Sequence, residues 1–221
     1  MTAPKLTFYL DVVSPFSYLA FHLLRTSRVF APCEISYVPI SLLGIMKASG
    51  NMGPFAVKSK AKWANLDRLR WAKAFDIPIS ESTPDPFPQS TLNAQRALAA
   101  LEAVAPEKVP VALEALYQAF WVEGTSPIGD EKVFGPILKG VLGEELGAKV
   151  CELAVGEEAK ERLQSSTDAI VEEGAFGAPW FVAENGKGER QMFWGFDHLG
   201  QVVEFLGLER EGAERGFRSF L

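Results

Sequence analysis

A strand-to-helix turn near the N-terminus carries the first candidate for chemistry. It has the sequence Asp-Val-Val-Ser-Pro-Phe-Ser over residues 11–17. Ser14 suits the N-cap of a helix, and Pro15 suits the first helical position, whose N–H has no helical partner. A helix N-terminus presents unpaired N–H groups and a partial positive charge, so it stabilises a thiolate or carboxylate brought there. Ser14 is therefore a candidate anion-binding residue, with simple helix capping as the alternative.

A second candidate is the loop Gly-Ala-Phe-Gly-Ala-Pro at residues 174–179, which precedes a β-prone segment. A proline at the head of a strand can follow a cis peptide bond. In that case the backbone of Ala178 would face outward and could pair with an extended peptide. The alternative for Pro179 is an ordinary Gly-Pro loop.

A third candidate is the turn Phe-Trp-Gly-Phe-Asp-His at residues 193–198, which ends in an acid at a predicted helix start. Asp197 could be a plain N-cap, or it could accept a hydrogen bond from the ammonium group of a ligand. For His198 a surface or capping role is expected.

The sequence lacks the motifs that several other kinds of catalytic or binding site require. The two cysteines, Cys33 and Cys151, are far apart in apolar surroundings, so buried free thiols are expected, and no Cys-x-x-Cys occurs. The two histidines, His22 and His198, have no partners at metal-ligand spacing, and no metal is expected. The motifs of serine hydrolases, P-loop enzymes and dinucleotide-binding proteins are absent as well.

The elements around these turns fall into three blocks. Residues 6–10 and 34–40 are β-prone and flank the helix that begins after Ser14. From about residue 42 to 174 the apolar spacing is helical; Trp63, Leu66, Leu69 and Phe75, for example, can share one helix face. Strand patterns return at 180–183 and 190–194 around an Asn-Gly turn, and a final helix follows. The order is β-α-β, a helical insertion, then β-β-α.

Composition sets broad limits. The chain has 221 residues, 48% hydrophobic and 23% charged, which suits one large domain or a domain with a nested subdomain. Its net charge of −6 leaves no basic surplus for phosphates, so neither nucleic acid nor membrane partners are expected. No apolar run approaches the roughly 20 residues that span a bilayer, and no signal peptide is evident. A reducing intracellular compartment is expected, the cytoplasm by default.

Taken together, these segments resemble the kappa-class glutathione transferases and their bacterial relatives, the 2-hydroxychromene-2-carboxylate isomerases, of the DsbA-like branch of the thioredoxin superfamily. The resemblance covers nearly the whole chain and also includes Leu-Gly-Ile-Met-Lys at 43–47, Ser-Gly-Asn at 49–51 and Asn-Ala-Gln-Arg at 93–96. It implies an α/β, thioredoxin-like (DsbA-like) fold with an all-helical domain inserted between the β-α-β and β-β-α halves. The implied domains are 1–42 with 175–221, and 43–174.

The resemblance also implies a glutathione site. Ser14 would be the catalytic residue, holding the glutathione thiolate by a hydrogen bond rather than acting as a nucleophile. Asp197 would pair with the γ-glutamyl ammonium group. This chain departs from the family in having Phe196 and His198 beside that aspartate, where a small or polar residue and an arginine are common. The implied glutathione-binding residues are Ser14, Pro15, Phe16, Asn51, Lys60, Ala178, Pro179, Phe196 and Asp197.

The function implied is transfer of glutathione, as co-substrate, to small hydrophobic electrophiles or peroxides. Aromatic side chains of the helical insertion are expected to wall the pocket of the second substrate. The alternatives are a glutathione-dependent isomerase of the chromene-carboxylate type and a catalytically inactive thioredoxin-like binding module. The resemblance further implies a homodimer, with mitochondria and peroxisomes as alternative locations, although residues 219–221 match a peroxisomal signal poorly.

Overall fold

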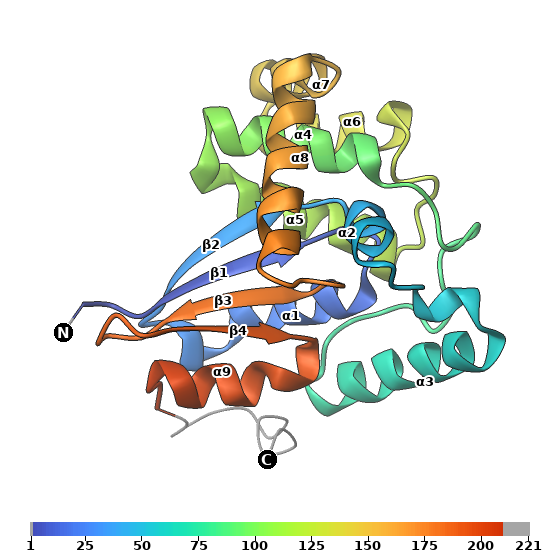
Figure 1. Cartoon of the computed structure of the whole chain (residues 1–221). Helices are drawn as coiled ribbons and strands as arrows, with labels where there is room; N and C mark the ends of the chain where they lie inside the picture. The colour runs from blue at the N-terminus through green and yellow to red at the C-terminus, as the bar shows by residue number, and fades with distance from the viewer. Residues whose placement is uncertain (1, 210–221) are drawn as a thin grey trace.

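The computed structural model describes residues 2–209, so residues 219–221 lie outside its described range. A four-stranded mixed sheet forms its centre (Figure 1). The strands are β1 (Lys5–Leu10), β2 (Glu34–Pro39), β3 (Trp180–Glu184) and β4 (Arg190–Trp194), in the order β2-β1-β3-β4. Strand β1 pairs in parallel with β2 and antiparallel with β3, and β3 pairs antiparallel with β4.

Seven helices lie between β2 and β3 in the sequence. Helix α1 joins β1 to β2, and α9 follows β4. The α-helices are α1 (Pro15–Thr26), α2 (Leu42–Ser49), α3 (Lys58–Ala74), α4 (Leu92–Val104), α5 (Val109–Tyr117), α6 (Glu131–Leu142), α7 (Glu144–Ala154), α8 (Glu157–Glu172) and α9 (Leu199–Leu206). The order β-α-β, helices, β-β-α confirms the predicted thioredoxin-like fold with a helical insertion.

Helices cover both faces of the sheet because alternate residues of its strands are apolar on each side. On one face Phe8 of β1 stacks on Phe181 of β3 at 5.1 Å between ring centroids, and Phe21 of α1 packs nearby. On the other face Trp180 and Val182 of β3 join a cluster with residues of α2 and α8. Helices α1 and α9 therefore lie on one side, and α2 and α8 lie on the other (Figure 1).

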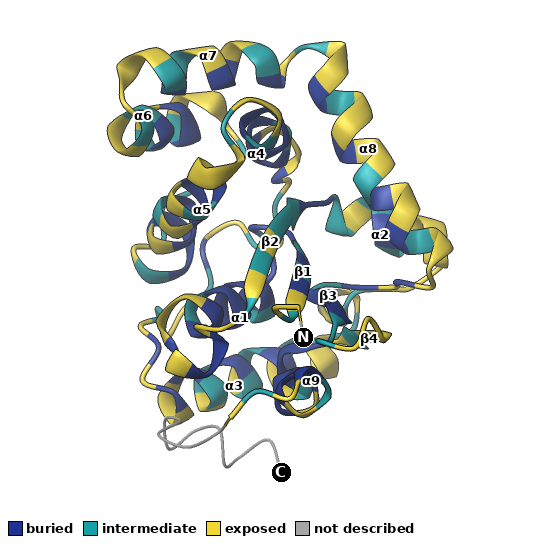
Figure 2. Cartoon of the chain, turned by 90° about the vertical axis from the view of Figure 1, so that its left-hand side faces the viewer, coloured by how far each residue is buried: buried dark blue, intermediate teal, exposed yellow. Residues whose placement is uncertain are grey.

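The inserted helices extend the core. Figure 2 shows α4 largely buried among α5, α6 and α7, while α8 carries much exposed surface. One apolar cluster continues from β1 and α1 into α4 through α7. The domain boundaries at 42/43 and 174/175 stay a prediction, since the two parts share this core. Within residues 2–209, no helix is both long and apolar enough to cross a membrane.

The predicted apolar face of α3 is wrong. Trp63 is 59% exposed and Leu66 is also exposed, whereas Arg68 is buried. The Arg68 guanidinium donates hydrogen bonds to the backbone carbonyls of Ser80 and Glu81 at 2.7 and 2.8 Å, and its Nε donates to an asparagine side chain. A buried charge is tolerated when its donors are satisfied. The loop after α3 supplies those acceptors. The face of α3 that carries Arg68 is therefore turned inward, in place of the predicted face that carries Trp63.

Candidate active site

One end of the sheet gathers the turns that the sequence singled out. In the register, Tyr9 of β1 pairs with Trp180 of β3, which pairs with Trp194 of β4. Strand β1 therefore ends where β3 begins and where β4 ends. The turn before α1, the loop 174–179 and the turn 195–198 consequently meet at this end, although up to about 180 residues separate them in sequence.

Ser14 is the N-cap of α1, and Pro15 occupies the first helical position as predicted. The Ser14 Oγ accepts a hydrogen bond from the Ser17 N–H at 3.2 Å and donates one to the Ala178 carbonyl at 3.3 Å. Its side chain thus both caps the helix and contacts the second candidate loop. Ser14 is 3% exposed, Pro15 is also buried, and Phe16 is half-buried.

The peptide bond between Ala178 and Pro179 is cis. The Ala178 carbonyl accepts the Ser14 hydroxyl, and the Pro179 carbonyl accepts the Gly195 N–H at 3.0 Å. This short segment therefore connects the cap of α1 to the turn that carries Asp197. All three candidate turns from the sequence are joined by direct hydrogen bonds.

Asn51 lies directly after α2 and belongs to the same cluster. Its Nδ2 donates to the Phe176 carbonyl at 2.7 Å, two residues before Ala178. Lys60 is exposed on the first turn of α3, and in the described part of the chain no hydrogen bond or ion pair connects it to the other predicted residues. The structure thus brings Asn51 to the candidate site, and the contact of the exposed Lys60 with glutathione stays a prediction.

Asp197 lies two residues after Gly195, whose φ of +97° is in the region that glycine adopts most readily. A Cβ at Gly195 would lie 2.5 Å from the Asp197 Oδ1, so the absence of a side chain lets the carboxylate fold back over the turn. The Asp197 side chain does not cap α9; it is 61% exposed and lies 3.4 Å from the His198 Nδ1. Its carboxylate is open to a ligand, as the ammonium-binding interpretation requires.

Phe196 is a core residue. It is 1% exposed, and its ring packs edge-on against Trp71 of α3 and against Phe75, which caps the C-terminus of α3, at centroid distances of 5.4 and 5.7 Å. Its side chain therefore anchors the Asp197 turn to α3 and leaves only backbone groups for a ligand. A small or polar residue at this position would lose that anchor.

Asp67 of α3 was missed by the sequence analysis. Burial, followed by the nearby Asp197 carboxylate, raises its pKa, and a hydrogen bond from the Trp71 side chain opposes the shift. The charges of Asp67 and Asp197 therefore interact, and two like charges near one site favour the approach of a cation. In the sequence, Asp67 is a single acidic residue within a helical pattern. Single acidic residues are common on exposed helix faces, so nothing marked Asp67 as a site residue.

Asp11 holds the turn before α1 in place through hydrogen bonds. Its carboxylate is buried and accepts hydrogen bonds from the Thr91 hydroxyl at 2.6 Å, the Leu42 N–H at 2.9 Å and the Val13 N–H at 3.1 Å. Its carbonyl accepts the Ser14 N–H at 3.0 Å. Asp11 therefore connects the turn before α1 to the first residues of α2 and α4.

Gln95 of α4 completes this support. Its amide donates to the carbonyls of Leu10 and Ile40 at 2.9 and 2.7 Å, and its Oε1 accepts the Val12 N–H at 3.3 Å. The Trp121 indole donates to the Val12 carbonyl at 2.9 Å. The helical insertion thus holds the turn that positions Ser14. These contacts span more than 50 residues of sequence, so local patterns could not reveal them.

Burial raises the pKa of Asp11, and its hydrogen bonds oppose the shift. A raised native pKa means that the folded chain binds this proton more readily than the unfolded chain. The protonated Asp11 carboxyl therefore stabilises the fold fully when the pH is below its pKa in the unfolded chain, about 3.9. This stabilisation is lost as the pH rises through the higher pKa of Asp11 in the folded chain. We expect the unfolding free energy of the wild type minus that of Asp11→Asn to fall as pH rises in this window. Urea unfolding at a series of pH values measures it, and a difference that rises with pH contradicts it.

Aromatic side chains lie on two sides of the site. From the insertion, Trp71 packs against Phe196, so the predicted aromatic wall of the second-substrate pocket stays a prediction. Tyr117, Phe120 and Trp121 of the insertion are fully buried in the core, so they do not wall an open pocket. Phe176 and Trp194, at 4.7 Å between ring centroids, are both partly exposed beside the loop 174–179. A Cβ at Gly177 would come within 2.8 Å of the Trp194 indole nitrogen, so glycine allows this close packing.

The cysteines take no part in the site. Both are free; Cys151 is buried and Cys33 is partly buried. Burial and the neighbouring Glu34 raise the pKa of Cys33 to about 12, which keeps it a thiol at neutral pH. Among residues 2–209, no group of three or more histidine, cysteine or acidic side chains could hold a metal ion.

A four-stranded sheet with a capped helix facing a cis-proline loop defines a protein of the thioredoxin class. A model of the DSBA-like thioredoxin domain family matches residues 5–207. The chain belongs to this family.

Three known proteins are similar over nearly their whole length. The chain is 28% identical to glutathione S-transferase kappa 1 of Caenorhabditis elegans, covering 92% of this chain and 91% of the relative. It is 30% identical to 2-hydroxychromene-2-carboxylate isomerase of Pseudomonas putida, covering 94% and 97%. A solved structure of a 2-hydroxychromene-2-carboxylate isomerase superposes with a TM-score of 0.71 at 25% identity, covering 92% and 94%. The resemblance inferred from the sequence is confirmed.

Proposed function

We propose that the protein is a glutathione transferase of the kappa type, in which Ser14 activates the glutathione thiolate for attack on small hydrophobic electrophiles. One observation carries the proposal. The Ser14 hydroxyl lies at the N-terminus of α1 and donates to the Ala178 carbonyl, beside the loop where an extended peptide would pair. The similarity to a kappa-class transferase supports it.

Ser14 would act by exchanging one acceptor for another. Its hydrogen bond to the Ala178 carbonyl is long at 3.3 Å, compared with about 2.7–2.8 Å for a typical hydroxyl donor. The hydroxyl proton can therefore turn to a sulfur atom at little cost, while the Oγ still caps the helix through the Ser17 N–H. Together with the helix N-terminus, this donor would lower the thiol pKa from about 8.5 towards 7, so that the thiolate fraction near neutral pH rises from a few per cent towards about half.

The rest of the peptide would extend across the loop. Asn51 would contact its glycine end, and Asp67 and Asp197 would hold the γ-glutamyl ammonium group between their carboxylates. The reaction forms a bond between sulfur and the electrophilic carbon and releases the leaving group as an anion, after the thiol proton has passed to solvent. We place the second substrate against Phe176 and Trp194, whose exposed rings suit a flat apolar molecule.

The direct test is calorimetric titration with glutathione combined with an assay using 1-chloro-2,4-dinitrobenzene. Saturable binding and steady release of chloride are expected. A protein that binds no glutathione would overturn the proposal and favour an inactive binding module. Size-exclusion chromatography with light scattering would test the homodimer that we also propose.

We expect Asp197→Asn to weaken glutathione binding about tenfold, because one exposed charge-assisted hydrogen bond to the ammonium group is lost. Asp67→Asn should weaken it in the same direction. The matched control is Asp168→Asn on α8, whose carboxylate is exposed and bonds to Gln164. Calorimetry with glutathione and with its desamino analogue measures the effect. If Asp197→Asn weakens both ligands equally, the carboxylate does not contact the ammonium group.

A second candidate function is glutathione-dependent isomerisation of a chromene carboxylate. The 30% identity to the Pseudomonas putida isomerase and the superposition on a solved isomerase favour it. Both reactions would use the same thiolate, so the site alone does not separate them. Parallel assays with the chromene carboxylate and with the dinitrobenzene substrate, compared by kcat/KM, decide between the two.

A further inference from the structure

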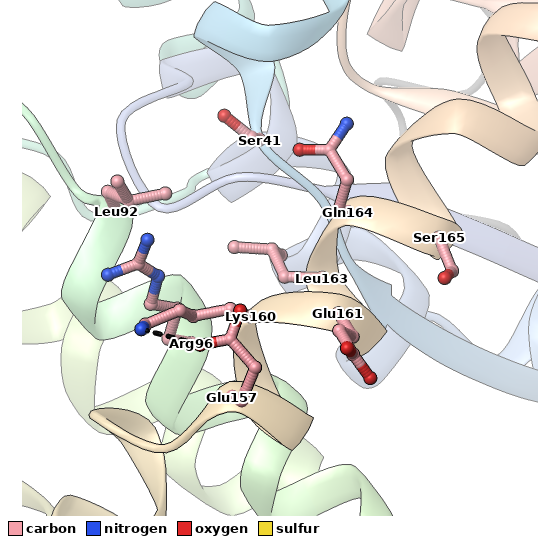
Figure 3. Close-up of a pocket in the computed structure, with 9 residues that line it drawn as sticks. All are labelled: Ser41, Leu92, Arg96, Glu157, Lys160, Glu161, Leu163, Gln164 and Ser165. Carbon is pink, nitrogen blue, oxygen red and sulfur yellow. Dashed lines mark hydrogen bonds and ion pairs between the residues drawn. The ribbon is translucent and has the colours of Figure 1, made fainter.

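A hollow of about 480 Å³ lies between α4 and α8, and none of its lining residues belongs to the glutathione site described above (Figure 3). Arg96 and Leu92 line it from α4, and Leu163 and Gln164 line it from α8, with Ser41 at its rim. Its volume falls within the range of about 300–1,000 Å³ that is typical of small-molecule sites.

Arg96 gives this hollow its chemistry. The Nε of Arg96 is buried, and no hydrogen-bond partner is found for it among the described residues. By contrast, the buried Arg68 donates to backbone carbonyls, and Arg190 pairs with Glu173 at 2.6 Å. Since buried donors in proteins are nearly always bonded, an unpaired guanidinium N–H beside a cavity points to an acceptor that is not part of the chain.

Two acidic side chains, Glu157 and Glu161, line the same hollow, but among the described residues no ion pair joins either of them to Arg96. Lys160 is already paired with Glu157 at 2.9 Å. The Glu161 carboxylate points away from the guanidinium (Figure 3). The positive charge of Arg96 is therefore available to an anion, and a guanidinium group matches a carboxylate or phosphate through two parallel hydrogen bonds.

The apolar side chains that line the hollow indicate which kind of anion would fit it. Leu92 is 39% exposed on one side of the hollow, and the side chain of Leu163 lies on the other. Leu163 is only 3% exposed, so Leu92 supplies most of the apolar surface beside Arg96. An apolar surface next to a cation suits a ligand with an apolar body better than a bare inorganic ion. We propose that this hollow binds a small carboxylate with an apolar body, its carboxyl group held by Arg96. The proposal is independent of the glutathione site.

The test is calorimetric titration of the full chain with three probes: benzoate, its neutral analogue benzamide, and inorganic phosphate. Benzoate is expected to saturate the protein, with benzamide and phosphate at least tenfold weaker. Arg96→Met should weaken benzoate binding at least tenfold and leave glutathione binding unchanged. The control Arg28→Met, at an exposed arginine, should change neither. Phosphate binding as tight as benzoate, or benzoate binding undiminished in Arg96→Met, would overturn the proposal.

A second measurement separates binding from structural support. Without ligand, Arg96→Met is expected to melt at or above the wild-type temperature, because the unpaired buried donor is removed. Benzoate should raise the melting temperature of the wild type but not of Arg96→Met. A clear fall in the melting temperature of Arg96→Met, relative to Arg28→Met, would assign Arg96 to internal support of the fold and overturn the proposal.

Discussion

Replacing Ser14 with alanine is expected to lower kcat/KM for glutathione conjugation about 100-fold or more, because a hydrogen-bond donor aimed at the reacting sulfur is removed. The pKa of the bound glutathione thiol should rise from about 7 towards its free value of about 8.5. The ultraviolet absorbance of the thiolate, recorded across a pH series with bound glutathione, measures this change directly. The pH at which half-maximal kcat/KM is reached should move upward with it.

Ser14 also caps α1, so its loss should lower the unfolding free energy by about 1 kcal/mol whatever its role in chemistry. Ser27→Ala is the matched control. The Ser27 Oγ accepts the Val29 N–H at 3.3 Å in the short helix that follows α1, away from the loop 174–179. Ser27→Ala should lose comparable stability and retain activity. If the two variants lose stability and keep activity alike, Ser14 is only a helix cap.

Local patterns were enough to predict the elements of the candidate site. Ser14 and Pro15 define a helix start by their own chemistry. The predicted hairpin of β3 and β4 forms, although its loop runs over residues 185–189 with the left-handed φ of +81° at Gly188 rather than through a two-residue Asn-Gly turn. Once the order of strands is known, the pairing of β1 with β3 and of β3 with β4 brings the three turns together. The pattern of strands and helices alone predicted the order β-α-β, helical insertion, β-β-α. The resemblance to a known family gave roles to the turns, whose chemistry, taken one turn at a time, had stayed open.

Side-chain orientation over long distances was not predictable in the same way. Phe196 was expected to offer a ligand only its backbone, and that stays a prediction; the packing of its ring against Trp71 and Phe75 was not predictable from the sequence. Trp63 was expected to be buried and is exposed, because the satisfied Arg68 occupies the inner face instead. In both cases the deciding partner is on another element, and its position depends on the complete fold.

Gln95→Met should cause the largest loss of stability among these variants. Methionine fills a similar volume but leaves the Ile40 carbonyl without a donor and the Val12 N–H without its acceptor. The Leu10 carbonyl loses one of its two donors and keeps the Ile40 N–H. Unsatisfied buried groups cost about 1–3 kcal/mol each and are not additive, so we expect a total loss of about 3 kcal/mol. For a chain of this size the melting temperature should fall by about 6–12 °C.

The exposed Gln201 of α9 provides the control, since Gln201→Met changes the same atoms without removing a buried hydrogen bond. Calorimetric melting of both variants measures the stability difference. Because Gln95 holds the two strand ends that lead to Ser14 and α2, Gln95→Met should also lose conjugating activity well below its melting temperature. Equal melting temperatures for the two variants would show that the turn before α1 is held by its other contacts, chiefly Asp11 and Trp121.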